Sequence, residues 1–126
     1  LGFSLYPHHL RGKSACTLQD FCAMIARTAD LMGPENIGIG SDLCQNQPDS
    51  VVEWMRVGRW TKQVDYGEGS ATNAGFPPMP DWFVDNRDFG NIEDGLRATG
   101  LSDRDVEGIM GDNWFRFFEA SFGPAK

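Results

Sequence analysis

The sequence predicts an α/β fold with a parallel βαβ unit, and three observations support this prediction. Residues 1–6 alternate between large apolar and other side chains, as in a half-buried strand. Apolar residues then recur at helical spacing from Leu18 to Met32, which indicates an amphipathic helix. A second short apolar run, Ile37 to Ser41, follows a Gly-Pro stop. A strand, a crossover helix and a second strand make a parallel pair with a right-handed crossover.

Length and composition exclude several classes of protein. The chain has 126 residues, about one small domain, and its hydrophobic fraction of 40% is enough for a core. No apolar run approaches the roughly 18 residues that a membrane helix needs, and no signal peptide is visible at the start. The formal net charge of −7 argues against a nucleic-acid partner, which favours a basic face. We therefore expect neither a membrane span nor nucleic-acid binding.

The cysteines indicate a reducing compartment. Cys16, Cys22 and Cys44 form an odd set without a CxxC pair, which fits free thiols better than a disulfide framework. The expected localisation is therefore cytoplasmic. Cys22 falls on the apolar stripe of the predicted helix, where we expect it to be a small buried hydrophobic residue.

The βαβ unit has recognisable start and stop signals. The chain opens directly in the first predicted strand, with no initiator methionine and no polar lead-in, so we expect a piece of a larger fold. Thr17 and Asp20 have the spacing of a capping box, with Asp in place of the usual Glu. Gly33 ends the helix. The glycines of Ile37–Ser41 suit close packing of a helix or a ligand against the second strand.

The middle of the chain, residues 44–90, is predicted to be a long loop. A short helix is expected to begin at Pro48. A loop of this length with its own aromatic residues is usually a functional lid or an interface. An ordered surface excursion without such a role is the alternative. The aromatic residues concerned are Trp60, Tyr66, Phe76, Trp82 and Phe83.

Residues 91–122 are predicted to be helical. We expect Asn91 to cap a short helix that Gly100 closes, and Ser102 to cap the next helix. Gly111 is expected to interrupt that helix. A final aromatic face is expected to pack into the core; it consists of Trp114, Phe117, Phe118 and Phe122.

A helix-turn-helix motif is another interpretation of these helices. Their acidic residues argue against contact with DNA, whose phosphates repel carboxylates. These residues are Asp103, Asp105, Glu107 and Asp112.

The most informative short stretch is IGIGSD, residues 37–42, in which a strand stops at a carboxylate. Asp42 is either a turn residue or a functional group at the rim of a sheet or barrel. In parallel α/β proteins the working residues lie at the carboxyl ends of the strands. Tyr6, His8 and His9 follow the first strand, so they are expected on the same rim as Asp42. Both interpretations of Asp42 remain open on this basis.

Three stretches, in the same order along the chain, also carry a resemblance to a known family. They are TLQDFCAMIARTADLMG, MGPENIGIGSD and FGNIEDGLRATGLSDRDVEGIMGDNWFRFFEASF. The last includes a Gly-x-Asn-x-x-Arg-x-x-Glu pattern at Gly111, Asn113, Arg116 and Glu119. Together they resemble parts of the membrane (renal) dipeptidases, which belong to the amidohydrolase-like, metal-dependent TIM barrels.

The resemblance implies a fold and an organisation. The chain would be a single segment, residues 1–126, from the C-terminal part of a (β/α)8 TIM barrel. Its two strands would be about the seventh and eighth of a barrel that needs about 250 residues. The segment would comprise a βαβ unit at 1–43, a long loop or lid at 44–90 and C-terminal helices at 91–122.

The resemblance also implies an activity. The intact parent protein would be a binuclear zinc dipeptidase that hydrolyses the peptide bond of dipeptides. The family's zinc ligands lie on earlier strands, so no metal ligand maps onto this chain, and the chain alone is expected to bind no zinc and to be inactive. It would pair with the missing barrel portion or self-associate. The alternatives are a non-catalytic fragment or interaction module, and a related amidohydrolase that acts on another small amide.

Two site residues follow from the resemblance. Asp42 matches the aspartate that is thought to handle the proton of the attacking water, and Tyr6 matches a tyrosine near the bound dipeptide. The family usually continues Asp-Phe-Asp-Gly, whereas this chain continues with DLCQ, which leaves the substrate range in doubt. His8 and His9 are not ligands in the family; they are either substrate contacts or loop residues without a special role.

Overall fold

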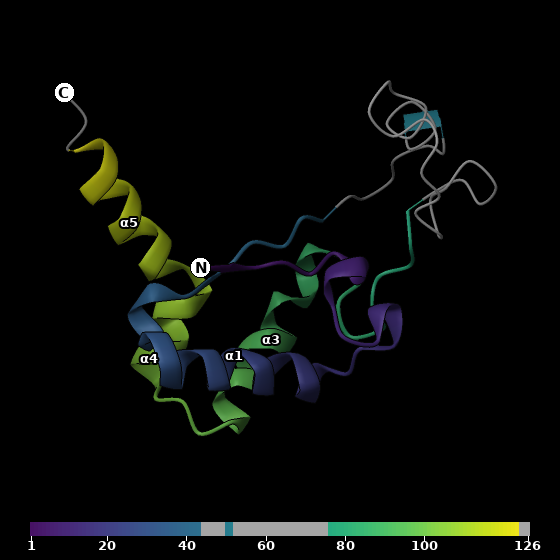
Figure 1. Ribbon diagram of the computed structural model, residues 1–126, viewed down its shortest axis with the longest axis horizontal. Helices are drawn as coiled ribbons and strands as arrows, with labels where there is room; N and C mark the ends of the chain where they lie inside the picture. The colour runs from purple at the N-terminus through teal and green to yellow at the C-terminus, as the bar shows by residue number, and fades with distance from the viewer. Residues whose placement is uncertain (44–49, 52–75, 124–126) are drawn as a thin grey trace.

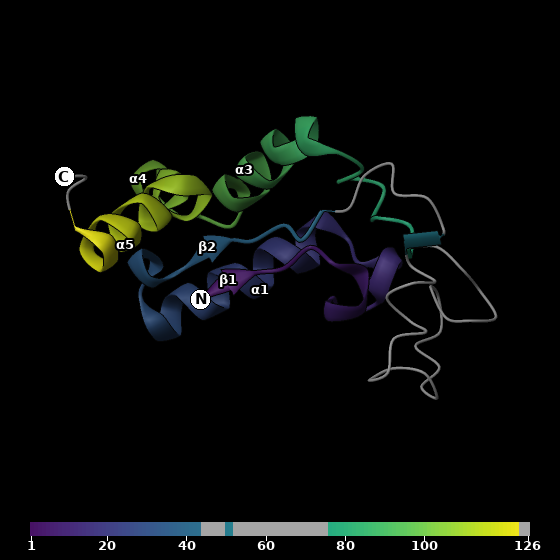
Figure 2. The ribbon, with the colours of Figure 1, turned by 90° about the horizontal axis from the view of Figure 1, so that it is seen from above.

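The computed structural model describes residues 1–43, 50–51 and 76–123. In these residues the chain forms an α/β body around two parallel strands, β1 (Gly2–Phe3) and β2 (Gly38–Ile39) (Figures 1 and 2). Gly2 lies opposite Gly38, and Phe3 lies opposite Ile39. The parallel strand pair predicted from the sequence is confirmed, although both strands are shorter than predicted.

Helix α1 (Leu18–Met32) forms the crossover between the strands. The backbone amide of Asp20 donates to the hydroxyl of Thr17 at 3.1 Å, so the expected N-terminal cap is present. At the other end Gly33 has a positive φ of 84°, and its amide donates to the carbonyl of Ala29 at 2.9 Å. Glycine adopts this backbone conformation at little cost, which is why the helix ends here.

Helix α3 (Phe89–Ala98) begins earlier than predicted. A 3-10 turn over Asn86–Asp88 leads into it, and Asp85 and Asp88 form a reciprocal capping box at the start of that turn. The prediction that Asn91 caps this helix is wrong, because Asn91 lies inside it. The Asn91 side chain instead donates to the carbonyl of Trp82 at 2.8 Å.

Ser102 caps helix α4 (Asp103–Glu107) as predicted, because the amide of Asp105 donates to the Ser102 hydroxyl at 3.2 Å. A π-helical turn, Gly108–Asp112, then runs directly into α5 (Asn113–Phe122). The α-helix is thus interrupted over residues that include Gly111, as predicted, but the interruption is a π turn that accommodates an extra residue and does not end the helical run.

The core lies between the strands, α1 and α3, which Figure 1 shows below the strands. The Phe3 and Phe21 rings pack edge to face, and their centroids lie 6.4 Å apart. Helices α1 and α3 approach closely, since a Cβ atom at Gly95 would lie 2.6 Å from the sulfur of Cys22. Cys22 is buried, as predicted. Other fully buried side chains include Leu5, Ile25, Ile37, Ile92, Leu96, Val106 and Ile109.

The end of the predicted long loop belongs to this core. Phe83 is fully buried, and the Trp82 ring lies 5.3 Å from the Phe21 ring of α1. This part of residues 44–90 is therefore not a detached lid. Trp60, Tyr66 and most of the helix expected after Pro48 lie outside the described residues, and a lid role for that part stays a prediction.

The aromatic face of α5 departs from the sequence prediction. Phe117 is 55% exposed, Phe118 is 49% exposed and Phe122 is 80% exposed, so the expected core packing is wrong for these three rings. The reason is that α5 extends away from the rest of the described chain, and only its first turn meets the strands (Figure 1). None of the helices in the described part of the chain has the length and apolarity needed to cross a membrane.

Candidate active site

The candidate active site lies at the carboxyl ends of β1 and β2. Past the strands, the amide of Gly40 donates to the carbonyl of Phe3 at 2.9 Å, and the amide of Leu5 donates to the carbonyl of Ser41 at 3.2 Å. These bonds keep the two segments side by side as far as Leu5 and Ser41. Tyr6 and Asp42 are the next residues, so the structure brings the two predicted site residues to the same end of the strand pair.

Asp42 is exposed and has a positive φ of 51°. This left-handed conformation is uncommon for residues other than glycine, although Asp and Asn tolerate it better than most. A strained backbone persists only where its surroundings hold it, and such positions cluster at functional sites. The conformation is thus compatible with a turn residue and with a carboxylate held in a fixed position.

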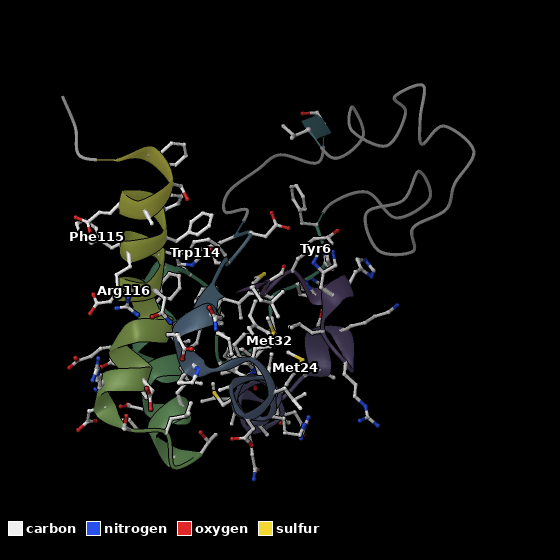
Figure 3. The ribbon with its side chains drawn as sticks, turned by 60° about the vertical axis from the view of Figure 1, so that its left-hand side comes forward. Tyr6, Met24, Met32, Trp114, Phe115 and Arg116 are labelled. Atoms are coloured by element: carbon white, nitrogen blue, oxygen red, sulfur yellow. The ribbon has the colours of Figure 1, made fainter. Side chains whose placement is uncertain are left out.

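Tyr6 is half-buried among residues from the same end of β1 (Tyr6 is labelled in Figure 3). Its ring centroid lies 5.5 Å from that of His8 and 5.2 Å from that of His9. Its backbone amide donates to the hydroxyl of Ser4 at 3.1 Å, and the same hydroxyl lies 3.0 Å from Nδ1 of His9. The two histidines therefore surround the Tyr6 ring.

Ser4 is a residue that the sequence reasoning missed. It contacts both Tyr6 and His9, and so helps to fix the geometry of this end of β1. The sequence contained a signal for the contact with Tyr6, because Ser4 and Tyr6 are two residues apart in the predicted strand and so lie on the same face of it. That face is opposite to the one on which Phe3 and Leu5 enter the core.

The described residues do not form a metal site. In residues 1–43, 50–51 and 76–123, no three or more His, Cys, Asp or Glu side chains are grouped so that they could hold a metal ion. A zinc pair would need ligands other than a cluster of these described residues.

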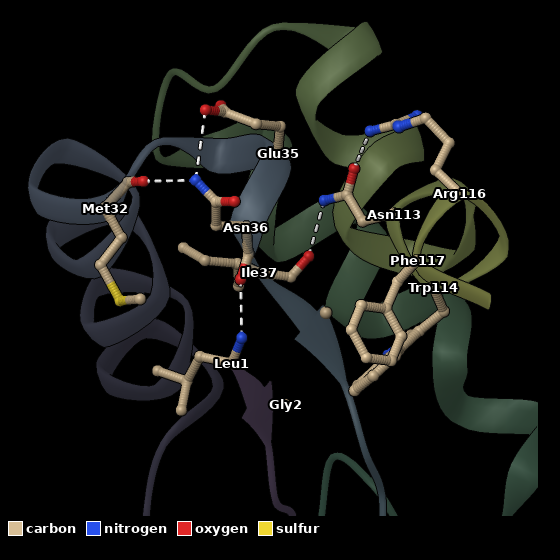
Figure 4. A pocket seen from close by; sticks show the side chains of 11 residues that line it. Leu1, Gly2, Met32, Glu35, Asn36, Ile37, Asn113, Trp114, Arg116 and Phe117 are labelled. Atoms are coloured by element: carbon tan, nitrogen blue, oxygen red, sulfur yellow. Dashed lines mark hydrogen bonds between the residues drawn. The ribbon is translucent and has the colours of Figure 1, made fainter. Parts of the chain in front are cut away.

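A pocket of about 620 Å³ lies at the opposite ends of the strands (Figure 4). Gly2 and Gly38 line one side of it, and Asn113, Trp114 and Phe117 line the other. Because this pocket is at the amino ends of parallel strands, it is separate from Asp42 and Tyr6, and we do not assign the catalytic site to it.

The start of α5 holds the edge of β2, which the sequence reasoning also missed. The Asn113 side-chain amide donates to the carbonyls of Ile37 at 2.6 Å and Pro34 at 2.8 Å. The Trp114 indole nitrogen donates to the carbonyl of Ile39 at 2.9 Å. The pattern at Gly111 to Glu119 that carried the resemblance contains Asn113, but the spacing alone did not reveal its partners.

One solved structure has the same arrangement of elements. A crystal structure of an amidohydrolase from Pseudomonas aeruginosa matches 94% of this chain with a TM-score of 0.71 and 22% sequence identity. The chain has the fold of part of an amidohydrolase. It spans 34% of the length of that protein, about a third. No family model matches the sequence, and no curated protein matches it. At 22% sequence identity the match establishes the fold of the chain and does not establish its chemistry.

Proposed function

We propose that the chain is the C-terminal part of a zinc-dependent dipeptidase similar to the membrane dipeptidases, in which Asp42 handles the proton of the attacking water. The observation that carries this proposal is the placement of Asp42 and Tyr6 at the carboxyl ends of neighbouring parallel strands. The match to part of an amidohydrolase supports it, because active sites of barrel enzymes lie at that end of the strands.

The chemistry requires a carboxylate in a fixed position. A general base must come within hydrogen-bond distance of the proton that it accepts. In the proposed reaction Asp42 accepts a proton from the attacking water and gives it to the leaving amine, while Tyr6 contacts the dipeptide or small amide. When bound, a zinc pair supplies an acidified water and a polarised carbonyl, but the described residues do not hold it.

The second candidate is a non-catalytic interaction module. Two observations favour it for the chain by itself: the described residues contain no metal-binding group, and α5 exposes several phenylalanine rings. In both cases the chain would pair with the missing barrel portion or with a second copy. We further propose a cytoplasmic location, for which the unpaired and buried Cys16 and Cys22 are the supporting observation.

The reading frame upstream of Leu1 separates the two candidates. About 200 further residues with a His-x-Asp motif would complete a barrel of ordinary length and favour the enzyme. A short upstream region without such a motif would favour the interaction module.

The functional test is the turnover of Asp42→Asn in the product of the complete gene, on a panel of dipeptides and small amides. Asparagine keeps the size and the turn preference of aspartate but cannot accept the proton. Removal of a positioned general base is expected to lower kcat by about 100-fold or more with unchanged zinc content. The matched control is Asp30→Asn, an exposed aspartate on α1, which should leave kcat unchanged. Near-normal turnover of Asp42→Asn would show that Asp42 is only a turn residue.

A further inference from the structure

We propose that His9 is a specificity-determining residue, which donates a hydrogen bond to the free C-terminal carboxylate of the substrate, and that Ser4 is the positioning residue that fixes the His9 ring. This inference rests on the proposed function and deepens it, because it gives the substrate class as dipeptides with a free carboxylate in preference to neutral amides.

The 3-10 turn Pro7–His9 is anchored in the core, so His9 has a fixed place at the carboxyl end of β1. Pro7 is fully buried, and Leu10, the residue after the turn, is 5% exposed. The amide of His9 donates to the carbonyl of Tyr6 at 2.8 Å, and the amide of Leu10 donates to the carbonyl of Pro7 at 3.0 Å. In a 3-10 turn, side chains three residues apart lie above one another. The His9 ring therefore lies against the Tyr6 ring, with the two centroids 5.2 Å apart.

Ser4 places the His9 ring over the strand face that is turned away from the core. Phe3 and Leu5 enter the core on one face of this segment, so Ser4 and Tyr6 lie on the other. Nδ1 of His9 lies 3.0 Å from the Ser4 hydroxyl, on that second face. Helix α1 packs on the core face (Figure 1). In the barrel of the proposed function the helices lie outside the strands, so the face with Ser4 lines the barrel interior, where the substrate binds.

The hydrogen bonds of Ser4 determine which ring nitrogen of His9 is a donor. The Ser4 oxygen accepts a hydrogen bond from the amide of Tyr6 at 3.1 Å, so its own hydrogen points elsewhere. In the described part of the chain, Nδ1 of His9 is the acceptor within hydrogen-bond distance of this hydroxyl. When Nδ1 accepts, the hydrogen of the neutral imidazole is on Nε2. The His9 ring thus presents an N–H donor at Nε2, as it also does when the ring is protonated.

The charge of this segment suits an anionic group. Asp20 is the first acidic residue of the chain, so the segment that carries His9 contains no acidic side chain, in a protein with a formal net charge of −7. Arg11 follows two residues after His9 and is exposed. A segment rich in donors and cations attracts anions, even on an acidic protein. Among the proposed substrates, a dipeptide has such an anion in its C-terminal carboxylate, whereas a simple amide has none.

The test compares glycyl-leucine with its C-terminal amide, glycyl-leucinamide, as substrates of the complete gene product. The wild type should have the higher kcat/KM for glycyl-leucine. In His9→Ala the ratio of the two kcat/KM values should fall by about 10-fold or more, the size expected for loss of a hydrogen bond to a charged group. The fall should come from a higher KM for glycyl-leucine. The value of kcat and the constants for glycyl-leucinamide should change little, because His9 binds the carboxylate and does not contact the reacting atoms.

Ser4→Ala tests the positioning role, because it removes the hydroxyl that orients the His9 ring and leaves the ring itself. The ratio should fall in the same direction and to a smaller extent. The matched control is Ser14→Ala, which removes a hydroxyl from the next 3-10 turn, Lys13–Ala15, where it donates to the carbonyl of Pro78 at 2.6 Å. This control should leave the ratio unchanged, which separates a loss of substrate selectivity from a general loss of stability.

Binding without turnover gives a second measurement of the same contact. Calorimetric titration of glycyl-leucine into Asp42→Asn and into the double variant Asp42→Asn/His9→Ala compares their dissociation constants directly. Binding to the double variant should be weaker by about 10-fold or more, for the reason given above. Glycyl-leucinamide should bind to both proteins equally.

An unchanged substrate ratio in His9→Ala would overturn the inference. An equal loss for both substrates would also overturn it, since His9 would then support the fold or the chemical step and not the contact with the carboxylate. The proposed function fails separately, through normal turnover of Asp42→Asn on glycyl-leucine. A large loss of turnover in Asp42→Asn with an unchanged ratio in His9→Ala would reject only the present inference.

Discussion

The indole nitrogen of Trp82 donates a 2.7 Å hydrogen bond to the carbonyl oxygen of Cys16, which lies 66 residues earlier in the chain. The same indole ring packs 5.3 Å from the ring of Phe21. This contact attaches the segment before α3 to the start of α1. It closes the core at the end of the molecule where Asp42 and Tyr6 lie.

Trp82→Phe should destabilise the protein by about 0.5–1.5 kcal/mol or somewhat more, because the Cys16 carbonyl loses its donor while the aromatic packing is largely kept. The measurement is the urea midpoint of unfolding. The control is Val84→Ala, at a 58% exposed position two residues away, which should shift the midpoint little. Equal shifts in the two variants would show that the Trp82 hydrogen bond contributes no stability.

Local signals were sufficient to predict the βαβ unit. Thr17 and Gly33 mark the ends of α1 through chemistry that acts within one turn, and the structure has both caps. The start of α3 was harder, because Asp85 and Asp88 compete with Asn91 as caps and the choice depends on how Trp82 and Phe83 pack. Such packing joins distant segments, which a local pattern does not encode.

The candidate site could be predicted only in part. The rule that parallel strands present functional residues at their carboxyl ends placed Asp42 and Tyr6 together. The left-handed backbone of Asp42 and the contacts of Ser4 depend on three-dimensional neighbours. The same holds for Trp114, whose spacing on α5 indicated core packing, whereas its indole nitrogen bonds to β2.

The buried thiols should make stability fall at alkaline pH. Burial, with a smaller contribution from Cys16, raises the pKa of Cys22 from its ordinary value of 9.0 to about 11. The unfolded state therefore loses its proton before the folded state does. The contribution of Cys22 to the free energy of unfolding is fully present below pH 9 and declines as the pH rises from about 9 to about 11.

The measurement is the urea midpoint at pH 8 and at pH 10.5 for the wild type and for Cys22→Ala. The variant is less stable at both pH values because it leaves a cavity. Its further loss between the two pH values should be smaller than that of the wild type. The same loss in both proteins would show that Cys22 does not titrate as described.

The 126-residue chain should not be a stable monomer by itself. In the described residues β1 and β2 form a sheet of two strands, and an isolated strand pair is marginally stable unless its edges and faces are covered. Phe118 and Phe122 add exposed apolar surface on α5. We expect sedimentation velocity to show association, and the double variant Phe118→Ser/Phe122→Ser to associate less. A monomer with one cooperative melting transition would contradict this expectation.

The central claim is that Asp42 serves a reaction and not only a turn, and Asp42→Gly tests it most directly. At a φ of 51° glycine relieves backbone strain, so Asp42→Gly should leave the melting temperature unchanged or raise stability by up to about 1 kcal/mol. Lys13→Gly is the matched control, because Lys13 has a φ of 53° and belongs to the 3-10 turn Lys13–Ala15 before α1. The measurement compares melting temperature and kcat for both variants of the complete gene product. Our account predicts that both variants keep or gain stability and that Asp42→Gly alone loses turnover, by about 100-fold or more. Full turnover in a stable Asp42→Gly protein would contradict it.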